Sequence, residues 1–181
     1  DIFDGSQARL ESSGSSAAFF SVQDTTAVNA EVIEDLKQAL FQQGGSIIRI
    51  CLHRAPSDAF HDMLILEQRG GYNRPHKHPV KEETFHMIEG CMVIVLFDDR
   101  GNVEDAVKLE PYGDILMRLG RDRYHAIHPL TPQVLYHESK PGPFRREEDL
   151  VFAPWSPDAE DKAAVSAFLS RMESFSMKEE M

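Results

Sequence analysis

The chain has 181 residues, which suits one domain with a sizeable core and is short for two domains of ordinary size. It carries 19 Lys and Arg against 30 Asp and Glu, a formal net charge of -11, and it contains no basic run. Nucleic acid and anionic membrane surfaces are therefore not expected partners. Two cysteines are too few for a disulfide framework, and neither an apolar stretch of about 18 residues nor a signal-peptide pattern is present, so we expect a cytoplasmic protein.

The two ends of the chain differ in pattern from its middle. Residues 1–27 include the small, polar run ESSGSSAA, which buries little apolar surface and predicts a partly disordered tail. Residues 28–43 place apolar side chains at helical spacing before two glycines, which predicts an amphipathic helix. Residues 158–181 return to helical spacing after Ser156 and Pro157, which suit a helix start. We therefore expect a tail, one domain over 28–157 with a leading helix, and a C-terminal helix.

Between the two helices lie short apolar runs bounded by turn residues. Eight candidate strands follow one another, at residues 46–53, 62–68, 84–90, 91–99, 103–110, 113–120, 123–130 and 133–139. Many short strands without a helical period predict an antiparallel double-layered sheet or barrel. Small barrels of this kind commonly bind a small molecule in the mouth or the centre.

The run RPHKHPVKEETFHMIEG, residues 74–90, concentrates histidines and acids. His76 and His78 are two residues apart, so in an extended strand their side chains share one face, which is the interior in a barrel. The segment TFHMIEG is expected to be the return strand of the same hairpin, which would bring the carboxylate of Glu83 beside them. His125, in a distant strand, would complete a set of N and O ligands that suits divalent first-row metal ions.

Other polar residues of these strands have competing interpretations. His86 is expected to be structural or to face solvent, and His128 should lie on the opposite face from His125 because it is three residues away. His137 is ambiguous, and Glu82 competes with Glu83 for the carboxylate role. Candidate substrate-binding residues are Arg74, Tyr124, Tyr136 and His53. Ion pairing on the barrel rim is the alternative for Arg74, and plain packing is the alternative for the two tyrosines.

The histidine cluster resembles the first cupin motif, G-x5-H-x-H-x4-E-x6-G. Its five fixed positions match Gly70, His76, His78, Glu83 and Gly90, which selects Glu83 over Glu82. The second cupin motif, G-x5-P-x-G-x2-H-x3-N, is kept in part around His125. Gly120 and Asp122 stand where Pro and Gly are expected, Pro129 replaces Asn, and Gly113 lies one residue too far upstream.

Further segments are similar to those of WbuC-type cupin-fold metalloproteins, in the same order over roughly residues 28–158. They read CLHRAPSD, RPHKHPVKEETFHMIEG, VLFDDRGNV, YHESKPGPF and FAPWSP. The resemblance implies a mainly β fold, a single cupin (double-stranded β-helix, jelly-roll-like) barrel with an N-terminal and a C-terminal helix and a bound metal. That family is similar to proteins encoded among genes for O-antigen and other surface polysaccharides. The resemblance implies no particular reaction.

Together these observations predict a mononuclear metal-binding cupin with His76, His78, Glu83 and His125 as ligands. One divalent ion, Fe, Ni, Zn, Mn, Co or Cu, would serve a metal-dependent enzyme acting on a small polar substrate, with a sugar or sugar nucleotide favoured by the resemblance. The alternatives are a metal-independent sugar-nucleotide isomerase or epimerase with a histidine base, and a non-catalytic small-molecule binding or sensor module. Barrels of this kind often pair through sheet edges, so a homodimer is an open alternative to a monomer.

Overall fold

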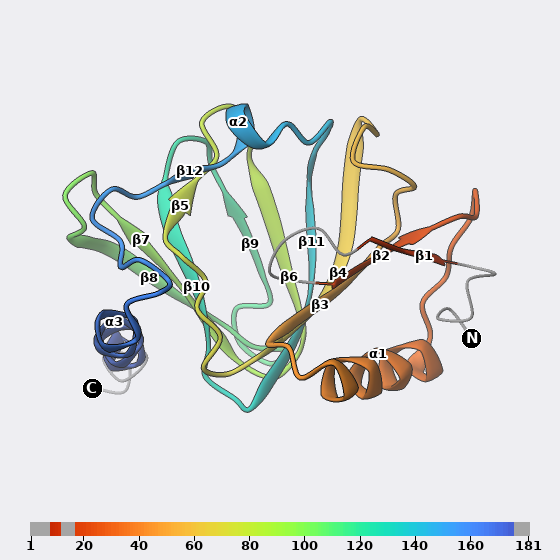
Figure 1. Ribbon diagram of the computed structural model, residues 1–181, viewed down its shortest axis with the longest axis horizontal. Helices are drawn as coiled ribbons and strands as arrows, with labels where there is room; N and C mark the ends of the chain where they lie inside the picture. The colour runs from red at the N-terminus through yellow and green to blue at the C-terminus, as the bar shows by residue number, and fades with distance from the viewer. Residues whose placement is uncertain (1–7, 12–16, 176–181) are drawn as a thin grey trace.

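The computed structural model describes residues 8–11 and 17–175, and most of its regular structure is β (Figure 1). One sheet has seven strands, in the order β1 (Ala8–Glu11), β2 (Ala17–Ser21), β3 (Ile47–Cys51), β4 (Phe60–Gln68), β11 (Gln133–Pro141), β6 (Glu83–Glu89) and β9 (Leu116–Leu119). The other has five strands, in the order β12 (Val151–Phe152), β5 (His76–Lys77), β10 (Tyr124–Pro129), β7 (Met92–Phe97) and β8 (Val103–Leu109). All pairings are antiparallel except that of β2 with β3.

The two sheets face each other across an apolar core. Because successive side chains of a strand point to opposite faces, every second residue enters this core. On β4, Met63 and Ile65 are buried between the sheets, whereas Leu64 and Leu66 are buried on the outer face. The core between the sheets is made mainly of Met, Ile, Leu and Phe side chains.

A helix covers the outer face of each sheet. Helix α1 (Ala30–Gln43) begins at Asn29, whose side chain accepts a hydrogen bond from the Val32 N–H at 3.0 Å, and packs beside β3. Helix α3 (Lys162–Phe175) lies on the other side of the molecule, against β7 and β10 (Figure 1). A one-turn helix, α2 (Arg146–Asp149), precedes β12. No helix in the described part of the chain is long and apolar enough to cross a membrane.

This architecture confirms a mainly β, jelly-roll-like barrel with a helix near each end. All eight expected strands are present, although their ends differ by a few residues. The tail prediction is wrong for residues 8–11 and 17–21, which form β1 and β2, because Phe19 and Phe20 bury their rings beside β3. Residues 1–7 and 12–16 of the expected tail, and 176–181 of the expected C-terminal helix, lie outside the described residues.

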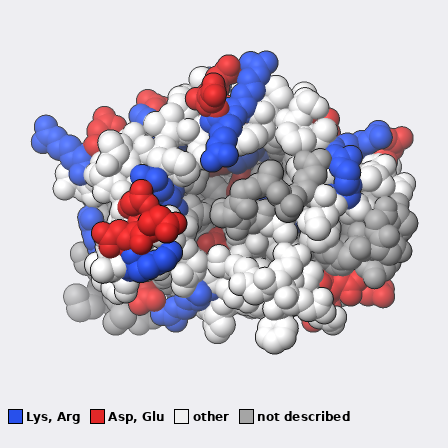
Figure 2. Space-filling model, in the orientation of Figure 1, with Lys and Arg blue, Asp and Glu red and all other residues white. Residues whose placement is uncertain are grey.

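The charged side chains on the face drawn in Figure 2 are mixed in sign. Lys and Arg lie beside Asp and Glu around its edge, and the described part of this face shows no continuous basic patch. Surface pairs such as Arg123 with Glu104, 2.6 Å apart, follow this arrangement. This surface resembles that of an ordinary acidic globular protein.

Candidate metal centre

Three histidines converge at one end of the space between the sheets. One ring nitrogen from each of His76, His78 and His125 lies within 4.8 Å of the other two. His76 is on β5 and is paired directly with His125 on β10, and their ring centroids are 4.5 Å apart. His78 follows β5 by one residue, with its ring centroid 5.1 Å from that of His76. The structure therefore brings together the three imidazoles that the sequence predicted as ligands.

The backbone fixes the orientation of all three imidazoles. The Nδ1 atom of His76 is 2.9 Å from the carbonyl of Arg74, and that of His125 is 3.1 Å from the carbonyl of Arg123. The Nδ1 atom of His78 bonds to the carbonyl of Asp149. A carbonyl oxygen only accepts hydrogen bonds, so each Nδ1 carries a proton, and the lone pair of a neutral ring in this orientation is on Nε2. Histidines that bind metals are usually oriented in this way.

Glu83 completes the group from the opposite sheet. Its Oε1 lies 2.9 Å from His78 Nε2, and its Oε2 lies 3.3 Å from His125 Nε2. Neither His78 Nε2 nor Glu83 Oε2 has a hydrogen-bond partner, although both atoms are buried. Buried polar atoms without partners are costly, and a cation between them would satisfy both. The four side chains therefore fit a divalent ion with N and O ligands.

Lys140 holds the Glu83 carboxylate on its other side. Its ammonium donates to Glu83 Oε1 at 2.9 Å and to Glu138 Oε1 at 2.8 Å. Burial alone would raise the pKa of the Glu83 carboxyl, but the positive charge of Lys140 contributes to holding that pKa well below its usual range. Glu83 is thus a carboxylate, the form that binds metals.

Desolvation also keeps His76 neutral. Enclosure by protein lowers the pKa of His76 to about 3, and the nearby His125 contributes to the shift. A neutral imidazole is the form that donates a lone pair to a metal.

The expectation that His76, His78 and Glu83 share one hairpin is wrong. β5 pairs with β10 and β12, whereas β6, which begins at Glu83, pairs with β11 and β9 in the other sheet. The segment between His78 and Glu83 crosses from one sheet to the other, so the carboxylate approaches the histidines from the opposite wall. The short distance in sequence correctly predicted that Glu83 lies beside His76 and His78, but wrongly predicted that the strands carrying them are paired.

The turn before His125 departs from the second cupin motif and contains a left-handed residue. Asp122 stands where that motif has glycine and adopts the left-handed conformation, with φ of 58°. Asp is one of the few residues other than glycine that tolerate this region. The backbone N–H of Asp122 donates to the carbonyl of His78 at 2.9 Å, and its carboxylate pairs with Lys77 at 2.7 Å. The substitution therefore preserves the link between the two histidine segments.

A cavity of about 490 Å³ adjoins the three histidines and Glu83. Charged and hydroxyl side chains from the inner face of the larger sheet line it together with apolar ones. They include Arg49, Glu67, Tyr136, Glu138 and Lys140. Its volume lies within the usual range for small-molecule pockets.

Two of the four predicted substrate-binding residues line this cavity. Arg74 does so, and its Nε donates to Ser156 Oγ at 2.9 Å while its guanidinium carbon lies 4.9 Å from the Phe152 ring centroid. Tyr136 is fully buried, and its hydroxyl donates to Glu67 Oε2 at 3.4 Å. Both side chains are in a position to contact a ligand near the histidines.

The other two predicted residues lie elsewhere. Tyr124 is on the outer face of β10, with its ring centroid 5.9 Å from that of Trp155. His53 stacks on His61 with ring centroids 4.1 Å apart, and its Nδ1 bonds to the backbone of Asp62. The structure does not bring either of them to the cavity.

Four charged residues that line the cavity are not among those predicted from the sequence, namely Arg49, Glu67, Glu138 and Lys140. A usable signal was present, because Tyr136, Glu138 and Lys140 alternate along β11 and therefore share its inner face. Arg49 likewise alternates with buried Ile48 and Ile50 on β3. From the sequence alone, a charged residue at such a position has the same pattern as a solvent-facing residue of a strand.

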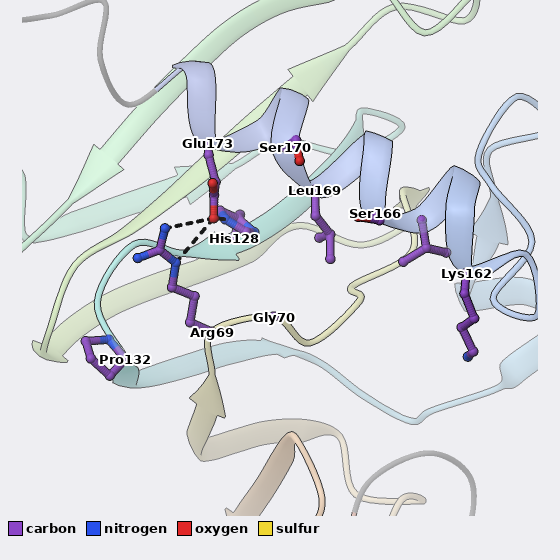
Figure 3. Close-up of a pocket in the computed structure, with 10 residues that line it drawn as sticks. Arg69, Gly70, His128, Pro132, Lys162, Ser166, Leu169, Ser170 and Glu173 are labelled. Atoms are coloured by element: carbon purple, nitrogen blue, oxygen red, sulfur yellow. Dashed lines mark hydrogen bonds and ion pairs between the residues drawn. The ribbon is translucent and has the colours of Figure 1, made fainter.

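The predicted orientations of His86 and His128 are confirmed. His86 is exposed, and His128 lies on the face of β10 opposite to His125. His128 borders a second hollow of about 610 Å³ between α3 and the turns at Gly70 and Pro132 (Figure 3). There Arg69 donates to Glu173 of α3 at 2.8 Å, and His128 Nε2 lies 3.6 Å from the same carboxylate (Figure 3). These contacts join α3 to the barrel.

Comparison with known proteins gives partial matches. Residues 36–109 match a family model described as "Domain of unknown function (DUF6016)", which is less than half of the chain. No curated protein matches.

Several solved structures resemble parts of the chain at low identity. KdgF from Halomonas sp. is 18% identical, with 56% of this chain and 84% of that chain covered and a TM-score of 0.44. The capsular polysaccharide assembling protein CapF from Staphylococcus aureus is 18% identical, with 55% and 30% covered and a TM-score of 0.44. Oxalate decarboxylase from Lactobacillus farciminis is 14% identical, with 52% and 27% covered and a TM-score of 0.43. This chain thus spans less than a third of CapF and of oxalate decarboxylase. At these identities and coverages, the activities of the three proteins are not assigned to this chain.

Proposed function

We propose that the chain is a mononuclear metal-binding cupin whose ion is held by His76, His78 and His125, with Glu83 as the fourth ligand. The observation that carries this proposal is the orientation of the three imidazoles. Each uses Nδ1–H on a backbone carbonyl and turns Nε2 toward the other two, opposite a buried carboxylate oxygen that has no hydrogen-bond partner. Such convergence of lone pairs is unfavourable without a cation.

The proposed activity is metal-dependent catalysis on a small polar substrate. When bound, the ion would supply Lewis-acid or redox chemistry, and His/carboxylate sets accept Fe, Mn, Co, Ni, Cu or Zn. The chain's own contribution is to orient the ligands through backbone carbonyls and to keep Glu83 ionised through Lys140. It also provides a cavity of about 490 Å³ beside the histidines.

A role in surface-polysaccharide metabolism, with a sugar or sugar nucleotide as substrate, is supported by the sequence resemblance to WbuC-type proteins. The sensor or binding-module alternative shares the metal site and differs only in lacking turnover. The histidine-base alternative is less well supported, because the Nε2 atoms point toward one another and a pKa of about 3 makes His76 a poor base at neutral pH.

Elemental analysis of natively expressed protein tests the metal site. The wild type is expected to contain close to one equivalent of a transition metal, and His78→Ala and His125→Ala are expected to lose it. His86→Ala is the matched control, because His86 is exposed on a strand that contributes Glu83. Full occupancy in both His78→Ala and His125→Ala would contradict the proposal.

Mass spectrometry of small molecules that co-purify with the protein addresses turnover. Incubation of a co-purified molecule with fresh metal-loaded protein should convert it to a new species, and chelation should stop the conversion. Unchanged recovery of the molecule would favour the binding-module alternative, and conversion that survives exhaustive chelation would favour the metal-independent one.

A further inference from the structure

The cavity beside the metal site is cationic, although the chain carries a net charge of -11. Three cations line it, namely Arg49, Arg74 and Lys140, against the carboxylates of Glu83 and Glu138. A third carboxyl, that of Glu67, is buried, and this burial raises its pKa to about 8, so it is mainly protonated at neutral pH. The lining therefore has one excess positive charge, and a bound divalent ion would add two more.

The three cations lie at different positions in the cavity. Lys140 bonds to both Glu83 and Glu138 and so neutralises the acids next to the histidines. Arg74 is held at Ser156 and over the ring of Phe152. Arg49 is on β3, two strands away from β11, where it shares a row with Ile65 and Tyr136.

The position of Arg49 sets a length scale for a ligand. Arg49 is on the same sheet as Lys140 and Glu83, but β3 is two strands from β11 and three from β6, which corresponds to about 10 Å and about 14 Å between strands. The ring of Phe85 lies beside both His125 and Tyr136, with its centroid 6.4 Å from that of His125 and 6.3 Å from that of Tyr136. A ligand that touches both the histidine cluster and Arg49 must therefore extend over several bonded atoms.

We propose that this cavity binds a small hydroxy acid, with its carboxylate on Arg49 and its hydroxyl end at the histidine cluster. This inference rests on the proposed metal-binding function and adds the class of ligand to it. Arginine binds carboxylates through two parallel hydrogen bonds, and an anion offsets the cost of enclosing excess positive charge. The protonated Glu67 carboxyl and the Tyr136 hydroxyl supply neutral partners for ligand hydroxyls between the two ends.

Paired probes that differ only in the acid group test the proposal. D-gluconate is compared with D-glucitol, and glycerate with glycerol, by isothermal titration calorimetry on zinc-loaded protein of measured zinc content. At least one acid is expected to bind about ten- to a hundredfold more tightly than its polyol, the factor for a charge-assisted hydrogen bond. Arg49→Gln should remove most of that preference without changing the zinc content, and Arg49→Lys should keep part of it.

A control separates the local charge from the net charge of the chain. Arg100→Gln removes an exposed arginine from the turn after β7 and should leave the preference unchanged. Equal affinity for acid and polyol in both pairs would overturn the proposal, and so would an acid preference that persists in Arg49→Gln, since the acid would then be bound by the metal alone. A wild type that takes up no metal would instead contradict the proposed function.

Discussion

The backbone N–H of Asp122 donates a hydrogen bond to the carbonyl of His78 at 2.9 Å. This bond joins the turn that precedes His125 to the segment that carries the other two histidines. In the turn that makes this bond, Asp122 adopts the left-handed conformation, with φ of 58°. The arrangement of the three imidazoles therefore depends on one residue that binds no metal itself.

Replacement of Asp122 tests this dependence. Asp122→Gly should preserve the turn and the metal affinity, whereas Asp122→Val should lower the free energy of unfolding by about 1–2 kcal/mol, because a β-branched residue resists the left-handed region. The Val variant should also bind zinc more weakly. Urea unfolding and a zinc competition titration measure the two effects. The salt bridge to Lys77 is a smaller contribution, since the Asp122 side chain is 61% exposed, and Asp122→Asn isolates it.

Lys140 should be essential for the stability of the barrel. Lys140→Met leaves Glu83 and Glu138 buried without their shared cation, which should lower the free energy of unfolding by about 3 kcal/mol or more. The double variant Lys140→Met/Glu138→Gln should recover part of this loss. Lys108→Met is the control, because its salt bridge with Glu110 is partly exposed and should be worth less than about 1 kcal/mol. Similar decreases in the free energy of unfolding for Lys140→Met and Lys108→Met would contradict a larger stabilisation by the buried ion pairs than by the partly exposed one.

Glu67 should make the stability depend on pH. Its pKa in the folded protein is raised from 4.5 to about 8, so the folded state retains a proton that the unfolded state loses above pH 4.5. The stabilisation from the neutral carboxyl is therefore complete below about pH 4.5 and is lost as the pH rises toward 8, a difference on the order of a few kcal/mol. Glu67→Gln, which cannot ionise, should lack this contribution. The difference in unfolding free energy between wild type and variant, measured from pH 5 to 8, should favour the variant increasingly with pH, and a constant difference would contradict the assignment.

Metal removal should lower the melting temperature through the same four side chains. An ion that binds only the folded state stabilises it by about 2.7 kcal/mol at a free concentration one hundred times its dissociation constant. Chelation should therefore shift the melting temperature of the wild type and of His86→Ala downward, and should leave that of His125→Ala unchanged. Differential scanning calorimetry with and without chelator measures the shifts. An equal shift in His125→Ala would place the ion elsewhere.

The strands and the two long helices could be predicted because their signals are local. Alternation marks β4 and β11, and spacing of three and four residues marks α1 and α3, within a single run of sequence. Strands β5 and β12 have two residues each and exist only through their pairing with each other and with β10, so no local pattern identifies them. β2 is similar, because its partner β3 is separated from it by a whole helix.

The ligand residues could be selected by spacing, but their arrangement could not. The distance in sequence between His78 and Glu83 fits both a hairpin and a crossover between sheets, and only the pairing of β6 with β11 decides between them. Arg49 and Lys140 illustrate a second limit. A charged side chain inside a strand has the same sequence pattern whether it faces water or a polar cavity. Which of the two it faces is determined by residues far away in the chain that form the other sides of the cavity.

The crossover after His78 places the three histidines on one sheet and Glu83 on the other. An ion held by all four is therefore a tether between the two walls of the barrel, comparable in topology to a disulfide that joins separate sheets. Such a tether resists sliding of one wall past the other, so the loaded barrel should be stiffer than the empty one. Arg49 and His125 stand on these opposite walls, and the span available to a ligand between them is set by whether the tether is in place.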